Sequence, residues 1–169
     1  MRLFTLILIS VIATSSYAGS PQSLSQLTLA YSAVLDTQNE ADFPVLIQES
    51  SHSYEKTLEN LRRSIKGSNF RLIREQLLGE GFNLEQSHVQ RESMIYFCNF
   101  NKVNKVLKID KRVGQFLPCR VTVTEQQGKV YVMAINPKYF GRLLANDKLT
   151  PVCDEITDMY KQIISEATF

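Results

Sequence analysis

Two short segments of alternating apolar and polar residues, joined by a tight turn, leave this chain few folds to adopt. In the first segment, 120–124, Val121 and Val123 alternate with polar residues, and the second, 129–135, is rich in β-forming residues. Gln127-Gly128 lies between them, and glycine readily takes the left-handed conformation that a two-residue hairpin turn requires. We therefore predict a β-hairpin here and an antiparallel sheet around it.

Further strand and helix patterns flank the hairpin. From β-forming or alternating residues, strands are predicted at 45–50, 69–74 and 93–100. From apolar periodicity and capping residues, helices are predicted from Ser53 to Gly67, over 101–109, over 139–144, and from Thr150 to the end. This order predicts an α+β two-layer sandwich, a mostly antiparallel sheet of about five strands with helices on one face.

The patterns conflict between residues 75 and 92. Gly79-Glu80-Gly81 and many polar residues favour an irregular loop, within which a short helix at 76–78 would fit. These glycines lack the third glycine and the strand-to-helix turn of a dinucleotide-binding motif. A plain loop is therefore predicted.

The first 18 residues have the pattern of a secretory signal peptide. Arg2 precedes an apolar run at 3–13, and Ser16-Tyr17-Ala18 places small residues where signal peptidase reads them. A membrane anchor would need about 20 apolar residues, more than this run contains. We expect cleavage after Ala18 and a location in the periplasm or outside the cell.

A lead-in segment, 19–43, is expected between the leader and a single α+β domain at 44–169. Leu24, Leu27 and Tyr31 recur at helical spacing in the lead-in, which indicates one weak helix. The alternative is a disordered tether. The domain is long enough to bury one hydrophobic core.

Charge and hydropathy argue against several kinds of partner. The chain has 19 Lys and Arg against 17 Asp and Glu, and the loss of Arg2 with the leader brings it closer to neutral. Such a balance gives no electrostatic reason to expect nucleic acid, or an acidic membrane surface, as partner. No second apolar run approaches membrane-spanning length, so no membrane span is expected after cleavage.

The sequence contains none of the common metal or cofactor motifs. No Cys-x-x-Cys or Cys-x-x-Cys-His is present, which argues against a catalytic dithiol and a covalent haem. His52 and His88 stand at no ligand spacing from a cysteine, so no metal site is predicted. No particular cofactor is indicated.

Three short motifs carry a resemblance to a known family. Cys98-Asn99 closes the predicted third strand, Leu117-Pro118-Cys119 opens the next, and Asn136-Pro137 follows the hairpin. With these motifs the stretch 53–166 resembles the domain-of-unknown-function family numbered 302, whose members are compact α+β domains. The resemblance implies that fold and no established reaction.

The chain also departs from the usual form of that family. Phe100 stands where many members have proline, and the leader, the lead-in and Cys153 are additions to the short cytoplasmic form. The resemblance therefore implies an exported, proteobacterial-like branch.

Three cysteines allow three pairings and leave one thiol over, and the sequence alone does not choose among them. If a helix returns the chain from Cys98 to a parallel fourth strand, Cys119 begins at the opposite end of the sheet. The hairpin would then bring Cys119 within reach of Cys153, so a Cys119–Cys153 disulfide is predicted. The alternative is that all three cysteines are reduced, buried apolar residues.

A candidate ligand site surrounds Cys119. Arg112 and Arg120 flank it in sequence, and two asparagines stand at strand ends, so guanidinium and amide groups gather beside a thiol. Such groups can hold a small anion or an oxidised sulfur species; the alternative is that they are surface charges and turn residues. The candidate ligand-binding residues are Cys98, Asn99, Arg112, Leu117, Pro118, Cys119, Arg120 and Asn136.

Together these patterns predict an exported accessory protein that binds a small molecule or a periplasmic redox protein. The alternative is a thiol-dependent enzyme or sulfur carrier that uses Cys98 or Cys119, although the sequence shows no base paired with either thiol. A third reading is a structural or assembly role through the apolar sheet face.

Overall fold

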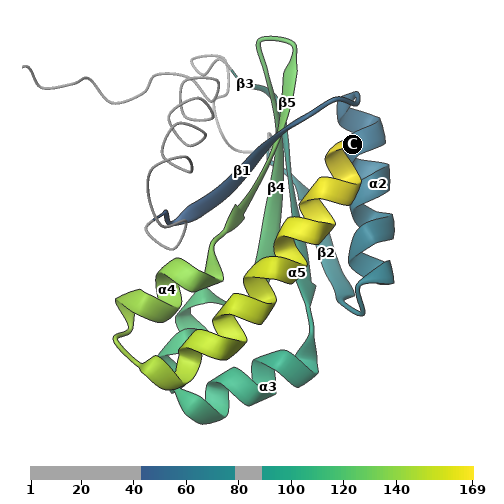
Figure 1. The fold of residues 1–169 in the computed structure, drawn as a ribbon. Helices are drawn as coiled ribbons and strands as arrows, with labels where there is room; N and C mark the ends of the chain where they lie inside the picture. Colours follow the sequence, from purple (N-terminus) through teal and green to yellow (C-terminus); the bar gives the residue numbers. More distant parts are fainter. Residues whose placement is uncertain (1–42, 79–88) are drawn as a thin grey trace, which may run out of the picture.

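The computed structural model describes residues 43–78 and 89–169 (Figure 1). The leader, the helix expected in the lead-in and Gly79-Glu80-Gly81 lie outside these residues. Within them, five strands form one sheet in the order β1-β5-β4-β3-β2, and every neighbouring pair is antiparallel. The strands are β1 (Val45–Ser50), β2 (Arg71–Leu77), β3 (Val89–Cys98), β4 (Cys119–Gln126) and β5 (Lys129–Ile135).

The helices lie in two groups. Two long helices lie side by side on one face of the sheet, and the shorter ones gather at the end of the sheet where β3 stops and β4 starts (Figure 1). The long helices are α2 (Tyr54–Gly67) and α5 (Thr150–Thr168). The shorter ones are α3 (Phe100–Ile109), α4 (Pro137–Leu143) and the 3-10 helices η3 (Lys111–Phe116) and η4 (Asp147–Leu149). The predicted α+β class with a five-stranded, antiparallel sheet is confirmed.

The hydrophobic core lies between the sheet and the two long helices. Its strand residues alternate along β3, β4 and β5, as expected where one face of an antiparallel sheet is covered. Each fully buried aliphatic side chain contributes about 1.5–3 kcal/mol relative to an exposed one. Residues at 0 or 1 % exposure in this core are Leu61, Ile65, Ile95, Phe97, Val121, Val123, Val132, Ile163 and Ala167.

The predicted hairpin is confirmed in both register and turn. Gln126 pairs with Lys129, and Val121 pairs with Ala134. Gln127 and Gly128 both have positive φ, 52° and 76°, which is the turn conformation whose twist matches that of the two strands.

The loop predicted at 75–92 is partly wrong. β2 continues to Leu77 and β3 already begins at Val89, so Gln76 and Leu77 of the short helix proposed at 76–78 are strand residues, and Leu78 lies in a turn. The polar residues here have partners across the fold: Glu75 pairs with Ile95 in the sheet and forms a 2.6 Å ion pair with Arg62 of α2. These tertiary contacts outweigh the local preference of polar residues for a loop.

The parallel arrangement predicted for the fourth strand is also wrong. β4 runs antiparallel to β3, and Phe97 pairs with Cys119. The reason is that α3 and η3 stay at one end of the sheet instead of crossing its face, so the chain re-enters beside the point where it left (Figure 1). Cys98 and Cys119 consequently lie at the same end of the sheet.

The last turn of α5 is tied to the start of the domain at the other end of the sheet. The backbone N–H of Ser51, just after β1, donates to the carbonyl of Thr168 at 3.0 Å, and the Ser51 hydroxyl donates to the same oxygen at 2.8 Å. No helix within 43–78 or 89–169 is long and apolar enough to cross a bilayer.

Candidate functional site

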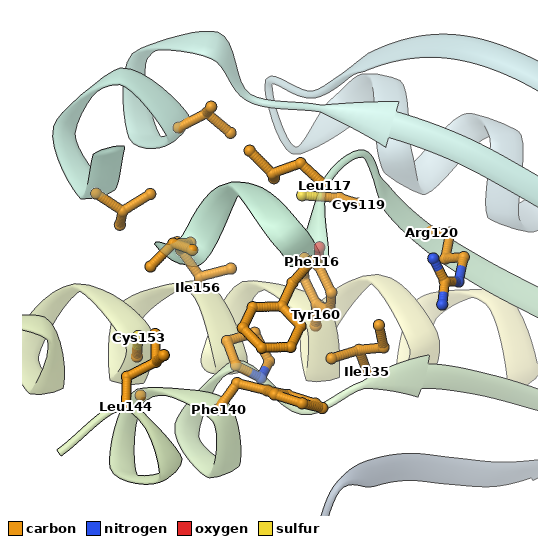
Figure 2. Close-up of a pocket in the computed structure, with 15 residues that line it drawn as sticks. Phe116, Leu117, Cys119, Arg120, Ile135, Phe140, Leu144, Cys153, Ile156 and Tyr160 are labelled. Atoms are coloured by element: carbon orange, nitrogen blue, oxygen red, sulfur yellow. The ribbon is translucent and has the colours of Figure 1, made fainter. Parts of the chain in front are cut away.

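An apolar cavity near the sequence motifs lies at the end of the sheet where the short helices gather. We call it the sheet-end pocket. It has a volume of about 80 Å³ and is walled by α3, η3, the start of β4, the end of β5, α4 and α5 (Figure 2). Nearly all of its wall is apolar, and it includes Val106, Phe116, Leu117, Phe140, Cys153 and Ile156. Protein interiors are otherwise close-packed, so such a space stands out.

Asn136 supports helix α4, which forms one wall of the pocket, but it does not itself line the cavity. It is fully buried at 0 % exposure, and its Oδ1 accepts from the Lys138 N–H at 3.1 Å, which caps α4. Its Nδ2 donates to the Phe43 carbonyl at 2.8 Å, and the Thr157 hydroxyl of α5 lies 3.4 Å from its Oδ1. Asn136 therefore fixes α4 against α5 and against the segment that leads into β1, a structural role.

Gly141 brings α4 close to α5 at the pocket wall. A Cβ atom built at Gly141 would lie 2.9 Å from the Sγ of Cys153 and 3.2 Å from its Cβ. Carbon and sulfur cannot approach that closely without displacement, so the absence of a side chain at this position sets the spacing of the two helices.

Arg112 supports the pocket from outside. Its guanidinium forms a two-pronged contact with Asp110, at 3.0 and 2.7 Å, and donates to the Leu144 carbonyl at 2.8 Å. Asn146 also donates to Asp110, at 3.1 Å. Arg112 holds the pKa of the Asp110 carboxyl well below its usual range. The group links η3 to the end of α4 and does not line the cavity.

Asn99 has a comparable structural role on the far side of α3. Its Oδ1 accepts from the Lys102 N–H at 3.1 Å and so caps α3, and its Nδ2 donates to the Asn69 carbonyl at 3.3 Å. This cap ends β3 at Cys98, two residues before the predicted end of the strand.

The Leu-Pro-Cys motif does reach the pocket. Leu117 and Cys119 line it, Leu117-Pro118 is a cis peptide bond, and Arg120 is the one charged residue in its wall. Figure 2 shows the hydroxyl of Tyr160 beside Cys119. Burial raises the pKa of the Cys119 thiol, and its hydrogen bond with Tyr160 offsets this only in part.

The other two thiols are also kept protonated. Burial raises the pKa of Cys98 to about 11, and burial raises the pKa of Cys153 to about 11 as well. Both side chains are less than a tenth exposed. At neutral pH these thiols behave as small, neutral, weakly polar groups.

The predicted Cys119–Cys153 disulfide is wrong, because all three cysteines are free. Cys119 and Cys153 face the pocket from two different walls, β4 and α5, with the cavity in between (Figure 2). The prediction selected Cys153 over Cys98 as the partner of Cys119 because it assumed a parallel fourth strand. Since β4 is antiparallel, that argument no longer holds.

Sequence reasoning missed the helical half of the pocket. Val103, Phe140 and Ile156 come from three different helices, and apolar spacing along each helix predicts only that one side is buried. A cavity depends on how those buried sides fit together, which single-helix patterns do not contain. The pocket therefore unites Leu117, Cys119 and Arg120 of the candidate residues, while the two asparagines and Arg112 hold its walls or neighbouring helices.

The family model described as "Domain of unknown function DUF302" matches residues 46–167, which include all of the pocket. The chain belongs to the DUF302 family. A solved structure described as an uncharacterized conserved DUF302 protein from Bacillus stearothermophilus is similar in fold, with a TM-score of 0.66.

That similarity extends over most of both molecules. It covers 73 % of this chain and 97 % of the Bacillus stearothermophilus protein, at 18 % sequence identity. At such low identity the likeness shows a shared DUF302 fold. None of the curated proteins matches this chain.

Proposed function

We propose that this DUF302 domain binds a small, largely apolar molecule in the sheet-end pocket. The observation that carries the proposal is a cavity of about 80 Å³ with an almost wholly apolar wall, built around Leu117 and Cys119 of the family motif. Ligand sites are typically concave and apolar with a few polar groups, and an apolar cavity can take up molecules such as benzene or xenon. The volume limits the ligand, or its buried part, to a few non-hydrogen atoms.

The protonation state of the thiols supports binding over thiol chemistry. A cysteine nucleophile or sulfur carrier acts as the thiolate, and burial raises the pKa of both Cys98 and Cys119. We therefore favour a binding function over a thiol-dependent enzyme. Alkylation by iodoacetamide distinguishes the two: slow reaction of all three cysteines at pH 7 is expected, and one fast-reacting Cys119 would favour the enzyme.

The binding proposal is tested with benzene and xenon as probes of the full chain. Both are expected to shift NMR signals of residues around the pocket, and benzene at ten times its Kd is expected to stabilise the fold by about 1.4 kcal/mol. Val103→Phe, which places a ring in the cavity wall, is expected to remove both effects. Val45→Phe, on an exposed site of β1, is the matched control and should leave them unchanged.

Two outcomes would contradict the proposal. One is a melting temperature that does not respond to benzene while xenon leaves the pocket signals unshifted. The other is a response that Val103→Phe and Val45→Phe alter equally, which would place the bound probe elsewhere on the molecule.

Export forms part of the proposed function. The charged residue, short apolar run and Ser16-Tyr17-Ala18 of the leader support delivery to the periplasm, where a small molecule or a redox protein would be the partner. N-terminal sequencing of the natively expressed protein tests this, and Gly19 is the expected first residue. A protein that retains Met1 in the cytoplasm would contradict export and leave pocket binding unaffected.

A further inference from the structure

One face of the sheet is turned away from α2 and α5 (Figure 1). We call it the outer face. Because Ile95, Val123 and Val132 belong to the core under the helices, the residues next to them in each strand point the other way. Two cross-strand rows form the centre of this face: Glu92, Thr124, Tyr131 and Glu49 in one, and Met94, Thr122, Met133 and Ile47 in the other.

Side chains at the centre of the outer face are sheltered, although the helices in the described part of the chain lie on the opposite face or at the sheet end. Tyr131 is 1 % exposed and Thr124 is 2 % exposed. Met94, Thr122 and Met133 are each only partly exposed. A large ring in the middle of a bare sheet face would have much of its surface in water, so this face has a cover.

The electrostatics of the same row agree with a cover. Burial raises the pKa of both Glu92 and Tyr131, which lie on either side of Thr124. A carboxyl group on an open sheet face would keep its hydration, so water is partly excluded here.

The second row has the composition of a packing surface. An antiparallel sheet with one solvated face usually carries polar side chains there, whereas Met94, Met133 and Ile47 form an apolar band across three strands. Methionine side chains are flexible and adapt to the surface that they contact. A sheet with a band of this kind is stable when another element covers it.

The path of the chain indicates which segment can reach the outer face. Phe43 is held by Asn136 at the start of β1, and β1 is an edge strand of the sheet. The seven residues 36–42 span at most about 25 Å when extended. The distance across the sheet from β1 to β3 is about 14 Å, three strand spacings. A segment that precedes residue 36 can therefore lie over either row.

The sequence of that segment suits an apolar band. No residue from Ser23 to Leu35 is charged, and apolar side chains recur at helical spacing at positions 24, 27, 31 and 35. As a helix, the twelve residues 24–35 would be about 18 Å long, close to the width of the two rows. A second copy of the chain is the other candidate occupant. The short connection favours the segment, because it keeps the local concentration of the segment at the millimolar level.

We propose that residues 24–35 dock on the outer face of the same chain as a helix and form a third layer of the domain. Leu24, Leu27, Tyr31 and Leu35 are the contacting side chains, and Met94, Met133 and Tyr131 form the centre of the surface that receives them. This inference is independent of ligand binding in the sheet-end pocket.

Methyl NMR of the full chain with ¹³C-labelled methionine tests the inference, with a soluble gadolinium chelate to broaden the signals of methyl groups that solvent reaches. Met94 and Met133 report on the outer face, and Met159, which packs against the core, is the internal reference. The first two signals are expected to be protected. Tyr31→Glu should increase their broadening several-fold, because it places a charge in the apolar stripe, and should leave that of Met159 unchanged.

Ala33→Glu is the matched control. It introduces the same charge two residues away, on the opposite side of the predicted helix, and should leave the protection of Met94 and Met133 intact. The Met159 signal shows that each variant is folded.

Three results would overturn the inference. Met94 and Met133 signals that broaden as strongly as those of free methionine in the unsubstituted chain would show that the face is open. Equal effects of Tyr31→Glu and Ala33→Glu, or no effect of either, would show that the segment does not dock through this stripe. Protection that is lost on dilution would assign the face to a second copy of the chain.

Discussion

At the scale of single residues, Asn136 shows how a motif position can be required without touching a ligand. Its side chain caps α4, bonds to the Phe43 carbonyl and meets Thr157, all from a fully buried position. A residue with one side-chain amide and several buried partners is difficult to replace, because each partner left alone costs free energy.

Asn136→Ala is therefore expected to lower the free energy of unfolding by about 1–3 kcal/mol, the sum of a lost helix cap and a lost hydrogen bond to the Phe43 carbonyl. Urea unfolding followed by circular dichroism measures the change. Asn104→Ala, on the exposed side of α3, is the control and should change stability by less than about 0.5 kcal/mol. Equal effects of the two substitutions would refute the capping role.

Gly141 gives a second residue-scale prediction. Gly141→Ala gains about 1 kcal/mol of helix propensity, but the new methyl meets Cys153 Sγ at 2.9 Å, and overpacking costs about 1–3 kcal/mol. We expect net destabilisation and weaker benzene binding. In a Cys153→Ala background the sulfur is gone and only the 3.2 Å approach to the Cβ atom remains, so the same substitution should be less destabilising. Additive effects in this double-mutant cycle would contradict the contact.

The buried thiols predict how stability changes with pH. Cys98 and Cys153 stay protonated in the folded state up to a pKa of about 11, whereas exposed thiols in the unfolded chain ionise near 9.0. The unfolded state therefore binds fewer protons between these values, and stability should fall as pH rises from about 9 to about 11. Cys153→Ala should make this fall less steep in urea titrations at each pH. An unchanged slope would argue that the thiol titrates normally.

At the scale of elements, the short helices at the sheet end are held by a few polar contacts. α4 has seven residues, too few for a stable isolated helix, so its position depends on its cap, on α5 and on the Asp110–Arg112 pair that reaches Leu144. That pair is largely exposed at the arginine, so its contribution to global stability is small.

Arg112→Ala is expected to change local opening more than overall stability. Hydrogen exchange of the amides near Leu144 should become several-fold faster, because the carbonyl at the end of α4 loses its donor. The urea midpoint should move little. Lys111→Ala, at the neighbouring exposed position, is the control and should leave exchange at Leu144 unchanged. Slower or unaltered exchange in Arg112→Ala would show that the pair does not hold α4.

The elements that the sequence predicted well are those with strong local patterns. The turn at Gln127-Gly128 requires positive φ, and the last helix has Pro151 near its start and a long apolar stripe. The missed strand residues, such as Glu75, have a polar composition that resembles a loop. Their structure comes from partners far away in sequence, Arg62 and Ile95, which no local window contains.

At the scale of the whole molecule, the direction of β4 explains most of the wrong predictions about the site. A helix between two strands suggested a parallel crossover, but α3 and η3 remain at one end of the sheet. The antiparallel β4 then places Cys98, Cys119 and the end of β5 together, and it creates the space that becomes the sheet-end pocket. The motif residues were identified from the sequence, whereas the cavity arises only when the helices and strands pack together.

The start and the end of the domain lie at opposite ends of the sheet, which determines where a label can be attached. Phe43 enters beside Asn136 at the pocket end, while the tie between Ser51 and Thr168 fixes the carboxyl terminus at the distant end (Figure 1). A fluorophore or surface tether attached after Phe169 therefore sits remote from the sheet-end pocket. Immobilised in that orientation, the domain would present its short helices to solution. Bound molecules could then be detected by their mass without interference from the linker.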